Sequence, residues 1–185
     1  MPIWLIVVLV VVVLLVILCV SLYNGIVTKR NRCENAWQNI DTQLQRRNDL
    51  IPNLVETVKG YAAHEKEVLS EVTKMRSAVQ SAGSPAEKMA ASNQLSGALT
   101  HLFAVAESYP QLQANENFVE LQRQLQDTEN KISYARQSYN DCVMTYNTAI
   151  ETFPGSMVAG FGGFQRMQGF EVTDASVREV PQVKF

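Results

Sequence analysis

Two long heptad repeats constrain the fold of this chain more than any other feature of its sequence. In the first repeat, apolar residues recur at alternating steps of four and three from Cys33 onward, in one phase. Its members are Cys33, Trp37, Ile40, Leu44, Ile51, Leu54, Val58, Tyr61, Val68, Val72, Met75, Val79 and Ala82. This spacing is typical of a long helix that buries one stripe, and a period near 3.5 favours a gentle, coiled-coil-like supercoil with a partner helix.

Pro52 lies inside this repeat, where a proline favours a kink or a break. It has no N–H for the Asn48 carbonyl, and its ring crowds the preceding turn. The heptad phase is nevertheless the same on both sides of Pro52. We therefore predict one kinked, continuous helix rather than two helices. It should end at residues 81–83, because Gly83 can adopt the left-handed conformation that closes a helix.

Two further helices are predicted downstream. Ser84-Pro85-Ala86-Glu87 is a capping box with proline at the first helical position, so a helix should follow to about Ser108. Asn115 can cap the next helix, which should end at Pro154. That helix has its own unbroken repeat: Phe118, Leu121, Leu125, Thr128, Ile132, Ala135, Tyr139, Cys142, Tyr146, Ala149 and Phe153. It would span roughly 54 Å at the ordinary helical rise.

These helices have to bury their apolar stripes on one another. Short connections make neighbouring helices antiparallel. We predict an all-α fold in which residues 25–154 form an antiparallel bundle of three to four helices, the number depending on how Pro52 is counted.

Residues 1–24 are predicted to be a membrane anchor. The run from Ile3 to Leu22 is uncharged and, at about 30 Å as a helix, matches the hydrocarbon core of a bilayer. A cleaved signal peptide fits less well, because no positive residue precedes the run and no small-residue cleavage site follows it. Trp4 and Tyr23 stand near its two ends, where aromatic rings tolerate the interface.

Flanking charge predicts the orientation of the anchor. Only two residues precede the span, whereas Lys29, Arg30 and Arg32 follow it. The excess of positive charge behind the span favours a cytoplasmic bundle and a short external amino end. We expect a single-pass membrane protein whose partners include membrane lipids.

Residues 155–185 form a tail rich in glycine and aromatic residues. Glycine disfavours a stable helix there, whereas Phe161, Phe164 and Phe170 argue against plain disorder. The tail could fold back on the bundle as a loop, or pack between subunits or on the membrane surface. The last nine residues, 177–185, could form a short extended piece docked on a neighbour.

The sequence contains no pattern of residues that carries known catalytic or cofactor chemistry. His64-Glu65 begins a string like that of zinc proteases, but residue 68 is a valine and not a histidine. The three cysteines have no metal or redox spacing, and no glycine-rich phosphate loop opens a helix. A net charge of −2 gives no basic field that would attract nucleic acid. We expect no enzyme activity, cofactor, metal or nucleic-acid partner.

Two charged residues occupy heptad positions that should be apolar. Arg47 and Glu65 could extend to solvent at an exposed edge of the seam. Alternatively, Arg47 forms a buried ion pair with Asp127 or Glu129 of the second long helix. Such a pair would add little stability but would fix the register of the two helices.

Long stretches of this sequence closely resemble the LemA family. They are RNRCENAWQNIDTQLQRRNDLIPNLVETVKGYAAHE (30–65), YPQLQANENFVELQRQLQDTENKISYARQSYND (109–141), YNTAIETFP (146–154), Gly160-Phe161 and Pro181-x-Val183-x-Phe185. The resemblance implies an antiparallel helical bundle behind one amino-terminal anchor, with the anchor in the bacterial inner membrane and the body in the cytoplasm. It implies no enzymatic activity, cofactor or catalytic residue. A related branch is associated with bacterial magnetosome membranes, which points toward membrane organisation.

Two functional hypotheses follow from these features. The first is a non-enzymatic, membrane-anchored scaffold that forms homo-oligomers. The default interpretation of the many asparagines on helix surfaces is ordinary solvation, whereas amide hydrogen bonds between protomers would explain their excess better. The second is an adaptor that binds another membrane protein, such as a protease or a sensor.

Overall fold

The computed structural model describes residues 2–170 and leaves Met1 and residues 171–185 undescribed. Every regular element in the described part of the chain is a helix. The elements are α1 (Ile3–Lys59), α2 (Lys66–Ser81), α3 (Pro85–Ala106), α4 (Pro110–Gln113), α5 (Glu116–Glu151) and α6 (Gly155–Gly162). The predicted all-α class is confirmed. The predicted extended piece at 177–185 lies outside the described residues.

Helix α1 passes through Pro52 without a break, as the heptad phase predicted. The Asn48 carbonyl loses its helical donor to the proline, but it accepts a hydrogen bond from Arg76 Nε of α2 at 3.2 Å. A neighbouring helix therefore satisfies the group that a proline leaves unpaired, and the proline ring itself faces solvent.

The prediction that this helix continues to residues 81–83 is wrong, because the chain reverses between Lys59 and Lys66. Tight backbone bonds close the reversal, including Ala62 N–H to the Val58 carbonyl at 2.8 Å. Val68 and Val72 of α2 face the core after the chain folds back, so the apolar residues keep the same heptad phase on both sides of the break. Heptad phase alone cannot distinguish a straight helix from such a hairpin.

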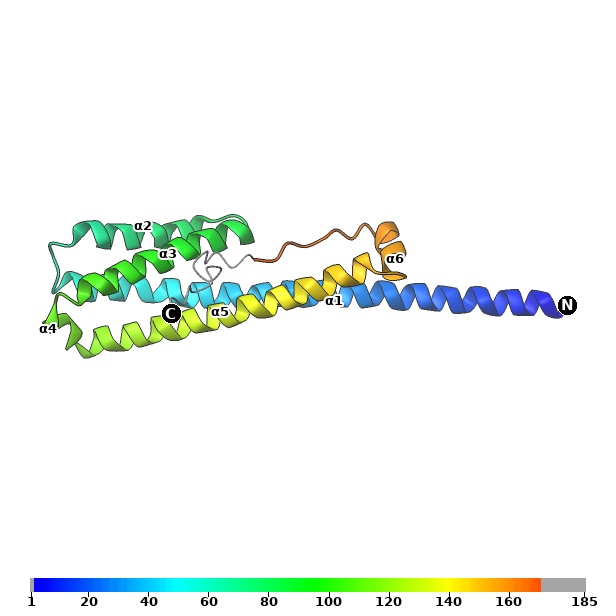
Figure 1. The fold of residues 1–185 in the computed structure, drawn as a ribbon, viewed down its shortest axis with the longest axis horizontal. Helices are drawn as coiled ribbons and strands as arrows, with labels where there is room; N and C mark the ends of the chain where they lie inside the picture. The colour runs from blue at the N-terminus through cyan, green and yellow to red at the C-terminus, as the bar shows by residue number, and fades with distance from the viewer. Residues whose placement is uncertain (1, 171–185) are drawn as a thin grey trace, which may run out of the picture.

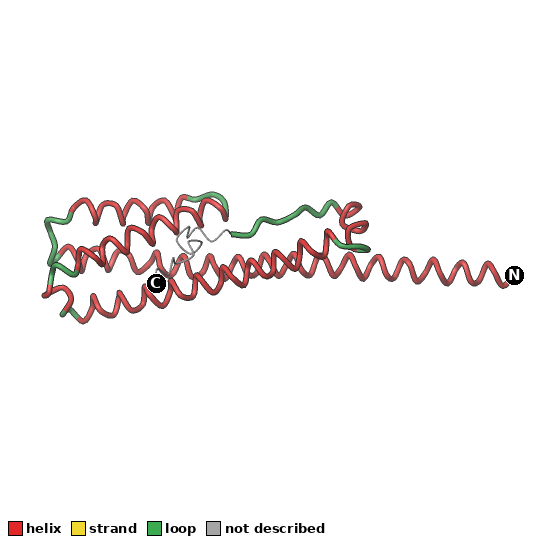
Figure 2. Tube along the Cα trace, in the orientation of Figure 1, coloured by secondary structure: helices red, strands yellow, loops and turns green. Residues whose placement is uncertain are grey.

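Figure 1 shows α1 and α5 side by side along the bundle, with α2 and α3 covering only the half that is distant from the N-terminus. The tube in Figure 2 shows the short connections that reverse the chain between successive long helices. The bundle therefore has four long helices, at the upper end of the predicted number. The fourth helix results from the reversal at 60–65 and not from Pro52.

The apolar interior consists of two separate cores. A distal core joins all four long helices, and its centre contains Ile51, Leu54, Val72, Leu95, Leu102 and Leu125. A proximal core lies nearer the N-terminal span, between α1, α5 and α6 with Met89 from the start of α3, and contains Ile26, Cys33, Ile40, Leu44, Ile132 and Tyr146. The division matters because polar side chains fill the layer between the two cores.

Both predicted N-caps are present. The Ser84 hydroxyl accepts a hydrogen bond from the Glu87 N–H at 3.2 Å, and the Asn115 side chain accepts one from the Phe118 N–H at 3.0 Å. The predicted end of the second long helix is too late, since α5 ends at Glu151 and Phe153 is exposed instead of lying in the core.

The described part of the glycine-rich tail contains a helix, contrary to the prediction of a loop. Residues 155–162 form α6, and residues 163–170 then run back along α5 as an extended segment, which we call the return segment. Helix α6 can form because Gly155 lies where a Cβ atom would come within 2.1 Å of the Ala149 carbonyl oxygen. Gly163, with φ of +67°, ends the helix in the left-handed conformation.

Candidate functional site

A polar layer separates the two cores at the middle of the bundle. Its members are Arg47 of α1, Ser92 and Ser96 of α3, and Thr128, Glu129 and Arg136 of α5. Arg47, Ser92 and Thr128 are buried in otherwise apolar helix stripes, with Arg47 between Leu44 and Ile51 for example. Ser96, Glu129 and Arg136 are half-buried beside these stripes. The layer thus joins three helices at one level.

Arg47 is the centre of the layer and is only 1% exposed. One guanidinium nitrogen, Nη1, donates to Glu129 and to Ser96 Oγ at 2.8 Å. The other, Nη2, donates to the Ser92 hydroxyl and to the Ser92 carbonyl at 3.0 Å. Burial lowers the pKa of Arg47, and the neighbouring Glu129 carboxylate opposes that effect.

The contact with Glu129 involves one of the two carboxylates that the sequence suggested for Arg47. The other, Asp127, points away and pairs with Lys131 on the surface at 2.7 Å. The Glu129 side chain is 40% exposed, so only the cationic half of the Arg47–Glu129 pair is buried. The role of this pair in setting the register remains a prediction.

Sequence reasoning missed Arg136, the second guanidinium of the layer. Arg136 Nη2 donates to Asn93 Oδ1 at 2.8 Å, and burial lowers the pKa of Arg136. Ser92 and Ser96 were also missed, although two small polar residues four apart in an apolar stripe of α3 are a signal that could have identified them. The hydroxyls are engaged by Arg47, so the layer serves to position helices.

The other two candidates in the first repeat, Glu65 and Pro52, lie away from the layer. Glu65 lies at the distal turn, where its carboxylate accepts a hydrogen bond from the Tyr109 hydroxyl at 2.8 Å. Tyr61 lies in the same turn and is exposed rather than part of the core, with its hydroxyl bonded to Asn115 Nδ2 at 3.0 Å. Pro52 faces solvent near that end of α1.

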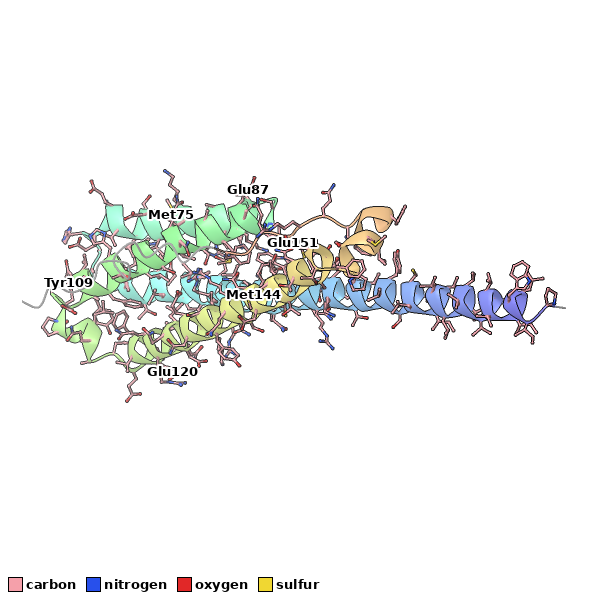
Figure 3. All side chains as sticks on the ribbon, turned by 45° about the vertical axis from the view of Figure 1, so that its right-hand side comes forward. Met75, Glu87, Tyr109, Glu120, Met144 and Glu151 are labelled. Atoms are coloured by element: carbon pink, nitrogen blue, oxygen red, sulfur yellow. The ribbon has the colours of Figure 1, made fainter. Side chains whose placement is uncertain are left out.

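The N-terminal part of α1 is not covered by any other described part of the chain. Ile3 and Trp4 are exposed, as is every described residue up to Ser21, and Leu22 is half-buried. Figure 3 shows the side chains of this segment projecting on all sides without a neighbouring helix. Among the described helices, only α1 is long and apolar enough to cross a membrane. A helix that is apolar all round suits a lipid environment.

A ladder of tyrosine and asparagine side chains on α5 holds the return segment. Asn140 Nδ2 donates to the Phe170 carbonyl at 2.9 Å, and Asn140 Oδ1 accepts from the Phe170 N–H at 2.8 Å. Asn147 makes the same two bonds to Met167, at 2.8 and 3.0 Å. Each amide therefore pairs with both backbone groups of one residue, as a neighbouring β-strand would.

Two tyrosines, each next to one of these asparagines, complete the ladder. The Tyr139 hydroxyl donates to the Gln168 carbonyl at 3.4 Å, and the Tyr146 hydroxyl donates to the Gln165 carbonyl at 3.0 Å. Burial raises the pKa of both tyrosines, so both retain the hydroxyl proton at neutral pH. The Tyr-Asn pairs are seven residues apart on the helix, and they bind residues three apart in the return segment.

The two spacings match because seven helical residues rise about 10.5 Å and three extended residues span about 10 Å. The same spacing of three places Phe164, Met167 and Phe170 against the proximal core. Phe170 stacks on Tyr139 and Trp37, with ring centroids 4.8 and 5.7 Å apart. The repeated Tyr-Asn dipeptide in the sequence was the missed signal for this site.

The phenylalanines proposed as interface residues thus divide into two kinds. Phe164 and Phe170 are half-buried against the bundle, which is the fold-back alternative for the tail. Phe161 on α6 is 93% exposed.

No group of three or more His, Cys, Asp or Glu side chains suited to a metal ion occurs in the described part of the chain.

Comparison with known proteins identifies the family. The LemA family profile matches residues 36–185. Magnetosome protein MamQ of Magnetospirillum gryphiswaldense is 27% identical over 174 residues, which cover 80% of this chain and 64% of that protein. Magnetosome protein MamQ 1 of Paramagnetospirillum magneticum is 27% identical over 175 residues, with the same coverage. Protein LemA of Metamycoplasma hominis is 26% identical over 168 residues, covering 89% of this chain and 73% of that protein.

The matched region is somewhat less than two thirds of the length of the two magnetosome proteins. Together with the apolar N-terminal helix, these similarities describe a membrane-associated helical protein. Since the family profile matches more than half of its residues, this chain belongs to the LemA family.

Proposed function

We propose that this protein is a non-enzymatic, membrane-anchored helical scaffold that self-associates at the cytoplasmic membrane. The observation that carries the proposal is the continuity of α1 from the exposed span into the core of the bundle. One uninterrupted helix fixes the bundle relative to its anchor, so such a molecule transmits position rather than chemistry. Its similarity to magnetosome proteins supports a role in organising or shaping membrane.

The outer face of α1 is the surface that we assign to self-association. Five exposed asparagines lie on one side of the helix, opposite its buried stripe, at spacings of seven, four, four and fourteen residues: Asn24, Asn31, Asn35, Asn39 and Asn53. An amide both donates and accepts hydrogen bonds, so two copies of this face are complementary to each other.

The size of the protein extracted with its lipids tests self-association. We expect a particle of several chains, and a monomer without partners would contradict the scaffold. Asn31→Glu with Asn35→Glu should reduce the particle size, since like charges would face each other. The matched control is Ser133→Glu with Gln137→Glu, which has the same spacing on the exposed surface of α5 and should leave the size unchanged.

The alternative function is an adaptor for another membrane protein, and the Tyr-Asn ladder favours it. The ladder recognises backbone groups of an extended segment, so a similar apolar segment of a partner could bind in the same way. Copurification of one partner at fixed stoichiometry, lost in Asn140→Ala and Asn147→Ala, would support the adaptor. Copurification that these changes do not affect would place the contact elsewhere.

We also propose that the amino end is external and the bundle cytoplasmic. Labelling of intact cells with an impermeant thiol reagent tests this placement. Cys33 is buried, so the reporter should be a cysteine introduced by Ser133→Cys at an exposed site, with Cys142→Ser to remove the half-buried native thiol. We expect no labelling until the cells are broken, and labelling of intact cells would reverse the orientation.

A further inference from the structure

Helix α6 presents an apolar surface that the bundle does not cover. Phe153, Met157 and Phe161 are 80%, 59% and 93% exposed. Met157 and Phe161 are four residues apart on α6, so they lie along one side of the helix, while Ala159 faces the proximal core and Phe153 precedes the helix. No charged residue occurs between Glu151 and Arg166.

Contacts with α1 place this helix directly beside the end of the membrane span. The Phe164 ring, just after α6, lies 5.3 Å from the Tyr23 ring. A Cβ atom at Gly162 would come within 3.2 Å of the Tyr23 ring, so the two helices touch closely. Tyr23 follows Leu22, the last residue of the span, and Figure 1 shows α6 where α1 leaves the bundle.

This level along α1 corresponds to the boundary between hydrocarbon and headgroups. A span of 20 residues from Ile3 fills the hydrocarbon core, and Tyr23 begins the next turn. Short helices with an apolar face commonly lie in this boundary layer with their apolar side chains inserted. Other large apolar residues exposed on the bundle, such as Val119, Tyr134 and Met144, are far apart along α5.

We propose that α6 is an interfacial helix, with Met157 and Phe161 inserted into the lipid surface that the span enters. The span alone leaves the bundle free to rotate about the axis of α1. A second lipid contact, displaced from that axis, would fix the rotation and so choose which side of the bundle faces along the membrane. The proposal needs the span but not self-association, and it holds for either face of the membrane.

Tryptophan fluorescence of the full chain in lipid vesicles tests this inference. Trp4→Phe with Trp37→Phe removes the native signals, and Phe161→Trp or Met157→Trp then reports on α6. The matched control is Tyr134→Trp, an aromatic site that is 77% exposed and about 25 Å further along the bundle. The vesicles are phosphatidylcholine with or without bromine on the acyl chains, and acrylamide serves as the quencher in water.

We expect the α6 tryptophans to emit at shorter wavelength, to lose most of their emission in brominated lipid and to resist acrylamide. The Tyr134→Trp control should show the opposite behaviour. Quenching of Phe161→Trp by acrylamide alone would overturn the proposal. Resistance to both quenchers would also overturn it, because protein rather than lipid would then cover α6. Circular dichroism shows whether each variant remains folded.

Discussion

At the scale of single residues, the buried charge of Arg47 is the most consequential feature of the core. The guanidinium is inaccessible to water, whereas the Glu129 carboxylate is partly hydrated. Removing a partner from a buried pair is costly chiefly when the remaining charge stays buried. The two halves of this ion pair should therefore respond unequally to mutation.

We expect Glu129→Gln to lower the free energy of unfolding by about 3 kcal/mol, because it leaves the Arg47 charge buried without a counterion. Arg47→Met should cost less, about 1–2 kcal/mol, since Glu129 can turn to water and only the hydroxyls of Ser92 and Ser96 and the Ser92 carbonyl lose a partner. Denaturation of the detergent-solubilised protein measures both. Asp127→Asn, which breaks a surface pair, is the control and should change little. A larger loss for Arg47→Met than for Glu129→Gln would contradict this account.

Cys33 provides a second test at the residue scale. Burial, with a smaller contribution from nearby Cys142, raises the pKa of the Cys33 thiol. A raised pKa means less thiolate at neutral pH, so reactivity should appear only as the pH rises or the protein unfolds. Alkylation followed by mass spectrometry should modify half-buried Cys142 well before Cys33. Equal rates at neutral pH would show that the proximal core opens readily.

At the scale of elements, the return segment depends on a few specific contacts with α5. Side chains of α5 bond its backbone at four residues, and three apolar side chains hold it on the proximal core. Gly169 is part of this fit, because a Cβ atom there would lie 2.9 Å from Asn140 Oδ1.

We expect Asn147→Ala to weaken docking of the return segment by about 2 kcal/mol, for the loss of two hydrogen bonds. Gly169→Ala should weaken it as well, by pushing the backbone away from Asn140. Limited trypsin digestion at Arg166 measures undocking, and Trp37 fluorescence follows the loss of the Phe170 ring. Gly160→Ala is the control, since a methyl group there meets nothing within 4 Å. Unchanged digestion of Asn147→Ala would show that the aromatic contacts alone hold the segment.

At the scale of the whole molecule, the polar layer divides the bundle into two units with separate cores. Units that share few apolar contacts can open with different free energies. The distal unit has four helices, whereas the proximal unit depends on α1, α5, α6 and the return segment, with only Met89 from α3.

We expect Ile40→Ala and Leu95→Ala to destabilise different units, each by about 2–5 kcal/mol. Both side chains are completely buried, which makes them a matched pair. Hydrogen exchange should increase mainly in the proximal parts of α1 and α5 for Ile40→Ala, and mainly in α2 and α3 for Leu95→Ala. Exchange that rises uniformly in both variants would mean that the bundle opens as one cooperative unit.

Local chemistry explains why much of the architecture could be predicted from the sequence. A long uncharged run, heptad spacing and side chains that cap helices act within one or two turns, so Ile3–Leu22, Ser84 and Asn115 could be interpreted directly. The continuity through Pro52 was also predicted, although the Arg76 bond that satisfies Asn48 was not. That bond comes from another helix and has no local signature.

An all-α fold with one apolar N-terminal span could be predicted from the residues alone, because those properties depend on residue periodicity and length. Tertiary packing was needed to show where the chain reverses, because a heptad phase is preserved whether a helix continues past Lys59 or folds back. It also decided that Arg47 meets Glu129, Ser92 and Ser96, and that the glycine-rich tail lies on Tyr-Asn pairs of α5. These contacts join residues far apart in sequence, and their energies depend on burial, which exists only once the helices have packed.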